Sequence, residues 1–207
     1  VCTSIQQVWN PMFMKNMEIR STGFQERTIQ FQTYYMAFVA IIGVGISLLS
    51  NEIFQLFIDP RYYDGWKIIP IVMYYYLFVA MAQQFYLKLC FVQKTKYLFY
   101  ANLIAAVISI AANLIFIKYF SLYGAAIALA LVGLFLMAIY YYYSQRYLHF
   151  IYQYKNAVII FIVFVIGTVS ALTLNFSLYL NITIKACMFS LLLVTLVCSN
   201  IISYGAI

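Results

Sequence analysis

Polar side chains recur on one face of an otherwise apolar stretch near the middle of the chain. Asn102, Ser109 and Asn113, with Ala106 between them, follow one another at intervals of three or four residues. This spacing places them on one side of an α-helix. An amide in hydrocarbon is costly unless it is hydrogen-bonded, so the stripe must face protein or water. It either lines a hydrated path or supports close helix packing through local hydrogen bonds.

A second polar group precedes this stripe. Gln84 and Lys88 lie one helical turn apart, near the end of an uncharged run. A lysine about a turn inside a membrane helix can extend its side chain to the interface. It can equally meet an anionic phosphate at the mouth of a cavity. The five candidate residues for a cavity or substrate path are therefore Gln84, Lys88, Asn102, Ser109 and Asn113.

Catalysis is not indicated by the residues that usually perform it. The single histidine, His149, lies among aromatic residues of a predicted loop. The acids lie in loops or at the ends of apolar runs and form no pair on one helix face: Glu18, Glu26, Glu52, Asp59 and Asp64. The cysteines show no metal-ligand spacing: Cys2, Cys90, Cys187 and Cys198. We expect no enzyme activity, no cofactor and no metal site.

The composition indicates whether the chain is suited to water or to a membrane. Of the 207 residues, 66% are hydrophobic and 8% charged, and the mean hydropathy is +0.93. Soluble domains carry about 25% charged residues, so the sequence predicts an integral membrane protein. The net charge of +7 is then explained by basic loops at one membrane face, and we expect no nucleic-acid partner.

Uncharged runs predict the elements that position the polar residues. A bilayer core about 30 Å thick needs roughly 20 apolar helical residues. We expect an all-α bundle with about six complete spans, at about 31–51, 68–90, 97–117, 122–143, 156–174 and 182–203. Residues 1–14 read as the end of one more helix, which Pro11 should kink or end. No charged residue falls at the centre of a span.

Basic residues predict the orientation of these spans. One set of loops and span ends carries eight: Lys15, Arg20, Arg27, Lys88, Lys94, Lys96, Arg146 and Lys155. The opposite set carries four, which we expect to anchor the spans at that boundary: Arg61, Lys67, Lys118 and Lys185. The positive-inside rule places the larger set in the cytoplasm. The C-terminus is then cytoplasmic too.

Three segments resemble a known family, the polysaccharide flippases of the MATE-like superfamily, which translocate O-antigen and capsule units in bacteria. They are "QQVWNPMF" at 6–13, "EIFQLFIDPRYYDGWKIIPIVMYYYLF" at 52–78 and "NLIFIKYFSLYGAAIA" at 113–128. The last resembles a pattern between two helices of the family. Here Lys118 stands where the family often has Pro, and Gly124 is the one glycine kept of two.

The resemblance implies a fourteen-helix transporter of which this chain is the C-terminal half. Residues 15–150 would be second-lobe helices and 151–207 two C-terminal helices. The chain begins at Val1 without an initiating Met, and we expect a large N-terminal part to be missing. That part would carry most of the family's cationic cavity residues, so the resemblance assigns no binding residue here.

The implied function is movement of undecaprenyl-pyrophosphate-linked oligosaccharide across the bacterial inner membrane by alternating access. The implied partners are this lipid-linked substrate, membrane lipids, the missing N-terminal half and polysaccharide-assembly proteins. Two alternatives stay open. One is another exporter of the superfamily, for a drug or a peptidoglycan precursor. The other is a membrane polymerase or acyltransferase, which would need a long loop carrying Arg, His or paired acids.

Overall fold

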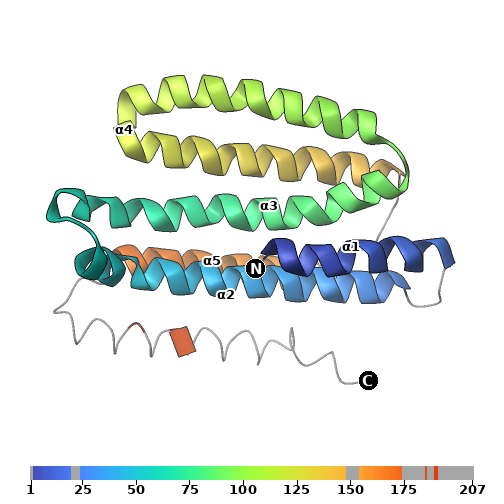
Figure 1. The fold of residues 1–207 in the computed structure, drawn as a ribbon, viewed down its shortest axis with the longest axis horizontal. Helices are drawn as coiled ribbons and strands as arrows, with labels where there is room; N and C mark the ends of the chain where they lie inside the picture. The colour runs from blue at the N-terminus through green and yellow to red at the C-terminus, as the bar shows by residue number, and fades with distance from the viewer. Residues whose placement is uncertain (1, 20–23, 148–153, 174–184, 186–188, 191–207) are drawn as a thin grey trace.

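A computed structural model describes residues 2–19, 24–147, 154–173, 185 and 189–190, and in this part of the chain all regular structure is helical. The elements, in order along the chain, are α1 (Cys2–Ile19), α2 (Phe24–Phe57), the short 3₁₀ helix η1 (Pro60–Lys67), α3 (Ile68–Phe91), α4 (Thr95–Tyr147) and α5 (Tyr154–Thr173) (Figure 1).

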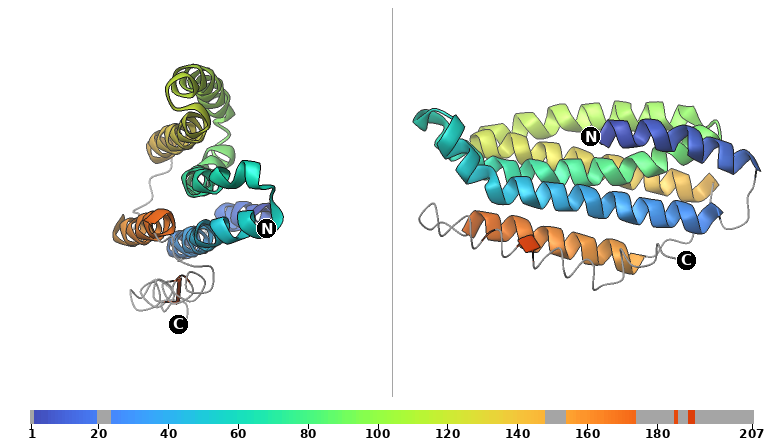
Figure 2. Two further views of the ribbon diagram at one scale, coloured as in Figure 1. Left: turned by 90° about the vertical axis from the view of Figure 1, so that its left-hand side faces the viewer. Right: turned by 60° about the horizontal axis from the view of Figure 1, so that its bottom comes forward.

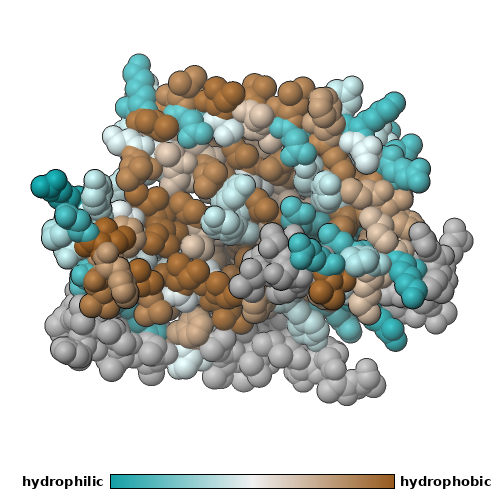
Figure 3. Space-filling view, viewed as in Figure 1, coloured by the Kyte–Doolittle hydropathy of each residue, from teal (hydrophilic) through white to brown (hydrophobic). Residues whose placement is uncertain are grey.

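The described helices are those of a membrane protein. Four of them contain a stretch long and apolar enough to cross a bilayer: residues 26–57, 60–91, 95–147 and 155–173. Large apolar side chains are widely exposed, as Leu114 (72%) and Ile110 (64%) on α4 illustrate. Figure 3 shows much of one face as apolar, with polar residues gathered mainly toward the ends of the helices. Such a surface is stable against hydrocarbon rather than water.

α4 is a hairpin of two antiparallel arms (Figure 1). The helical backbone breaks at Ser121, where φ is 50° and ψ is −127°. Each arm, residues 95–120 and 122–147, would extend about 39 Å at ~1.5 Å per residue, enough to cross the ~30 Å core. Gly124 is required just after the break, because a methyl group there would overlap the carbonyl of Phe116 in the first arm.

The helices α5, α2, α3 and α4 pack side by side in that order. α3 has its most extensive contact with α4, and α2 contacts α3 and α5 to a similar extent. The end view shows α2 and α5 side by side, with α3 and then α4 above them (Figure 2). Small residues allow these approaches: a Cβ at Gly43 of α2 would lie 2.9 Å from the Phe164 ring of α5. Tyr74 of α3 shares a 2.7 Å hydrogen bond with Thr168 of α5.

The predicted spans agree with the helices at their centres and differ at their ends. Residues 68–90 correspond to α3, 156–174 to α5, and 97–117 and 122–143 to the two arms of α4. Helix α2 extends well beyond the predicted 31–51, and α1 continues through Pro11 to Ile19. The predicted loop after residue 14 is therefore partly helical. The sixth predicted span, 182–203, falls outside the described residues except at 185 and 189–190.

Each end of the bundle has its own composition. At one end lie the start of α2, the end of α3 and both termini of α4, with exposed cations that we call the basic end: Arg27, Lys94, Lys96 and Arg146. At the opposite end, which we call the hairpin end, η1 and the break of α4 lie together. Arg27, Lys94, Lys96 and Arg146, four of the eight basic residues grouped in the sequence analysis, thus lie at one end of the bundle.

Candidate functional site

A cavity lies at the hairpin end, and we call it the tip cavity. It has a volume of about 590 Å³ and is formed by the end of α2, η1, the start of α3 and the turn of α4. Its apolar floor comes from Phe54, Ile68, Ile69, Val72 and Met73. Arg61, Tyr62 and Asp64 of η1 also line it, as do Ser121 and Tyr123 of α4.

Local contacts within η1 and between η1 and α2 fix the wall of the tip cavity that η1 forms. Asp59 caps η1 by accepting a 3.0 Å hydrogen bond from the Arg61 N–H, and Pro60 follows at the first helical position. One turn on, Lys67 Nζ donates to Asp64 Oδ1 at 3.0 Å. Gly65 allows η1 to lie against α2, since a Cβ there would be 2.9 Å from the Phe54 ring.

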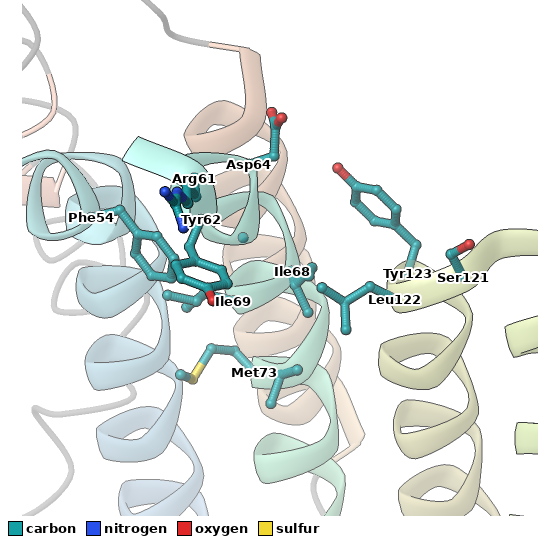
Figure 4. Close-up of a pocket in the computed structure, with 12 residues that line it drawn as sticks. Phe54, Arg61, Tyr62, Asp64, Ile68, Ile69, Met73, Ser121, Leu122 and Tyr123 are labelled. Atoms are coloured by element: carbon teal, nitrogen blue, oxygen red, sulfur yellow. The ribbon is translucent and has the colours of Figure 1, made fainter. Parts of the chain in front are cut away.

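The break in α4 determines the position of the opposite wall. Figure 4 shows Tyr123 and Leu122 projecting from the start of the second arm toward η1 and α3, with Ile68 facing Leu122. The Phe54 and Tyr62 rings lie together on the other side of the cavity. The conformation at Ser121 therefore determines how the two walls face each other.

The tip cavity combines groups suited to an amphiphile. A guanidinium can bind a phosphate through paired N–H donors, and tyrosines offer both a stacking face and a hydroxyl. The apolar floor lies directly beneath these groups. The arrangement fits a molecule that carries an anionic or hydroxylated head on a hydrocarbon chain.

A smaller cavity of about 340 Å³ lies toward the basic end, where α2, α3, α4 and α5 meet; we call it the four-helix cavity. Methionines from three helices line it: Met36, Met81 and Met137. The Phe85 and Tyr141 rings, in edge contact at 5.3 Å, form another wall. Its polar side chains on α2 are Gln32 and Thr33.

Gln84 and Lys88, predicted as cavity or path residues, are buried on α3 and belong to the lining of neither cavity. Their side chains are 4% and 1% exposed. Lys88 therefore does not extend its ammonium group to the surface, and this burial argues against the interfacial interpretation of that residue. Its Nζ lies 5.9 Å from the centre of the Phe85 ring.

The stripe on the first arm of α4 is bonded within its own helix. Asn102 Nδ2 donates to the Leu98 carbonyl at 2.9 Å, and Asn113 Nδ2 donates to the Ser109 carbonyl at 2.9 Å. These bonds satisfy both amides within their own helix, with Asn102 exposed and Ser109 and Asn113 half-buried. The choice between close packing and a hydrated path stays a prediction. The stripe and the Gln84–Lys88 pair lie on different helices, and no described bond joins them.

A buried ion pair near the hairpin end was not anticipated. Lys185 Nζ donates to Glu52 Oε1 at 2.8 Å, with side chains 1% and 6% exposed. Lys185 was expected to anchor at the membrane boundary; instead its charge is neutralised by an acid from α2. Gln32 and Tyr123 also escaped the sequence reasoning. In the sequence, each of these two residues is simply a polar residue inside or beside an apolar run. Many other positions show the same pattern.

Comparison of the chain with models of protein families, with curated proteins and with solved structures finds no match to any of them.

Proposed function

We propose that this chain is part of a bacterial membrane transporter that moves undecaprenyl-pyrophosphate-linked oligosaccharide from the inner to the outer leaflet. The observation that carries the proposal is the tip cavity, where a guanidinium and tyrosines lie above an apolar floor. A lipid-linked glycan presents the matching chemistry: pyrophosphate, sugar hydroxyls and a long hydrocarbon chain. The resemblance in segments 52–78 and 113–128 supports the same substrate, because both segments line this cavity.

The arrangement of the helices also favours transport. α2 and α3 lie at the centre of the row of helices, and among the described residues a cavity lies toward each end of the bundle. Movement of α3 and α4 relative to α2 and α5 would open one end while closing the other, as alternating access requires. In this proposal the tip cavity is the exit side, where the pyrophosphate contacts Arg61 before release.

The first test is complementation of a flippase-deficient strain with the complete gene. Arg61→Ala should reduce surface polysaccharide by tenfold or more, because a charge-assisted hydrogen bond contributes about 1.5–3 kcal/mol. Lys118→Ala is the matched control, since Lys118 is also an exposed cation near the hairpin end but does not line the cavity. It should leave transport unchanged.

Protein yield and thermal stability should be equal for both variants, because both side chains are exposed. Equal transport by both variants would contradict the assignment of Arg61. Failure of the unmodified gene to complement, together with acquired resistance to amphiphilic drugs, would replace the glycan substrate with a drug.

A further inference from the structure

At the basic end, the two arms of α4 bring cations to the same side of the hairpin. The Tyr147 hydroxyl of the second arm donates to the Tyr97 hydroxyl of the first at 2.7 Å, so these side chains face each other. Lys96 and Arg146 each come one residue before a member of this pair, which is about 100° around the helix. Because the arms are antiparallel, both rotations lead to the same side (Figure 1). Lys96 and Arg146, both exposed, therefore lie at the same level on one side of the hairpin.

An apolar surface extends from these two cations along both arms. On the first arm, side chains that follow Lys96 at intervals of four and three residues share its side of the helix. They are all exposed: Tyr100, Leu103, Val107, Ile110 and Leu114. On the second arm, Tyr142 and Phe135 precede Arg146 by four and eleven residues and are exposed as well. We call this surface, together with Lys96 and Arg146, the hairpin face.

The cations of the hairpin face have no acid on their own helix or on the helix packed against it. No aspartate or glutamate follows Asp64 in the sequence, so α3 and α4 contain none. Glu18 and Glu26 belong to α1 and α2, on the other side of α3 from α4 (Figure 2). A third cation increases the local charge, because Lys94 Nζ lies 5.5 Å from the centre of the Tyr147 ring. Such a group of basic residues at a membrane surface attracts anionic lipids.

These surroundings select among the molecules that a membrane offers. Ammonium and guanidinium groups donate charge-assisted hydrogen bonds to a phosphate. The ammonium of a zwitterionic lipid would meet three cations and no carboxylate of α3 or α4, so a headgroup of net negative charge is preferred. Both arms belong to an apolar stretch that can cross a bilayer, and hydrocarbon chains can lie against their exposed apolar side chains.

We propose that the hairpin face binds an anionic phospholipid, with its phosphate between Lys96 and Arg146 and its acyl chains along the two arms of α4. The lipid neutralises cations for which α3 and α4 supply no acid. It is distinct from the transported glycan, because the hairpin face shares no residue with the tip cavity and its cations lie at the opposite end of the bundle.

The test uses the purified complete protein and phosphatidylglycerol that carries a photoreactive diazirine in one acyl chain. After irradiation, we expect adducts on peptides from residues 100–114. Unlabelled phosphatidylglycerol should compete at least about tenfold better than phosphatidylcholine with the same chains, because only the former has a net charge for the cations to attract. Glycerol phosphate lacks the acyl chains and should not compete, which separates a lipid from a free phosphate.

Charge-matched variants separate the site from general attraction of lipid to the basic end. Lys96→Gln with Arg146→Gln should weaken competition by phosphatidylglycerol about 25-fold, or about fivefold for each cation. Arg27→Gln with Lys155→Gln is the control, because it removes two exposed cations from the starts of α2 and α5. It should leave the competition unchanged. Lys96→Arg with Arg146→Lys keeps both charges and should retain binding.

The comparison of the two lipids on the unmodified protein does not depend on any variant being stable. Equal competition by phosphatidylglycerol and phosphatidylcholine would overturn the proposal. An equal loss of competition in the control variant would show that the lipid responds to total charge rather than to the hairpin face. Adducts confined to peptides outside α4 would overturn the proposal as well.

Discussion

Ser121 adopts a backbone conformation that glycine tolerates better than any residue with a side chain. Its φ of 50° lies on the left-handed side of conformational space, where Cβ crowds the backbone. The chain accepts this strain because the two arms of α4 must reverse direction within a few residues. The same residue forms part of the tip cavity, so strain and candidate function coincide at one position.

Ser121→Gly should stabilise the protein by about 1 kcal/mol, because relief of strain outweighs the added freedom of the unfolded chain. Thermal unfolding in detergent measures the effect. Ser109→Gly is the comparison within a regular helical arm, where glycine should instead cost about 0.5–1 kcal/mol. Destabilisation by both substitutions would show that the conformation at Ser121 is not strained.

At the scale of elements, the close approach of α4 to α3 depends on Gly133. A Cβ at this position would lie 3.0 Å from the Tyr75 ring and 3.3 Å from the Tyr75 carbonyl oxygen. Gly133→Leu should therefore force the second arm away from α3 and cost about 1–3 kcal/mol or more. Ala111→Leu, on an exposed position of the first arm, should be tolerated. The yield of folded protein and its unfolding temperature distinguish the two.

The Glu52–Lys185 pair holds a residue beyond α5 against α2. Glu52→Gln should destabilise the protein by about 3–5 kcal/mol, because it leaves a buried ammonium without its counter-charge. The double exchange Glu52→Lys with Lys185→Glu should recover part of that loss. Asp64→Asn breaks the exposed pair with Lys67 and should change little. Equal effects of Glu52→Gln and Asp64→Asn would mean that the buried pair does not form.

For the whole molecule, the basic end should face the cytoplasm. In a protein whose native cysteines have been replaced, Lys94→Cys and Lys96→Cys should resist an impermeant thiol reagent applied from outside. Lys118→Cys, three residues before the break at Ser121, should react with it. The reverse pattern of labelling would invert the bundle and place the tip cavity on the cytoplasmic side.

The sequence predicts the helical class and the centres of the described spans, because charge-free length is a local property. It misses their ends for reasons that are also local. Polar residues before residue 31 continue α2, and Pro11 is accommodated within α1. Neither the polarity of a residue nor the presence of proline determines by itself where a membrane helix stops.

The cavities could not be predicted in the same way. Gln32 and Tyr141 both line the four-helix cavity but are far apart in the sequence, and the existence of the cavity depends on how α2, α3, α4 and α5 pack together. Lys88 shows the converse, because its position near a helix end suggested a side chain at the interface or at the mouth of a cavity, and packing has buried it. Periodicity shows which residues share a face but does not show what that face meets.

The α4 hairpin is held at both ends by contacts within itself. At the turn Gly124 lies against Phe116, and at the base the Tyr147 hydroxyl donates to that of Tyr97 at 2.7 Å, while the Tyr97 and Tyr143 rings stack at 4.5 Å. The Gly124–Phe116 contact joins residues close in sequence and can form early, whereas Tyr97 and Tyr147 are 50 residues apart and meet when the two arms pair. During synthesis this segment can consequently fold as a unit and enter the bilayer as a preassembled pair. Because Lys118 lies close to the turn, its charge would then cross the bilayer together with both apolar arms. The insertion of both arms would contribute favourable free energy to that transfer.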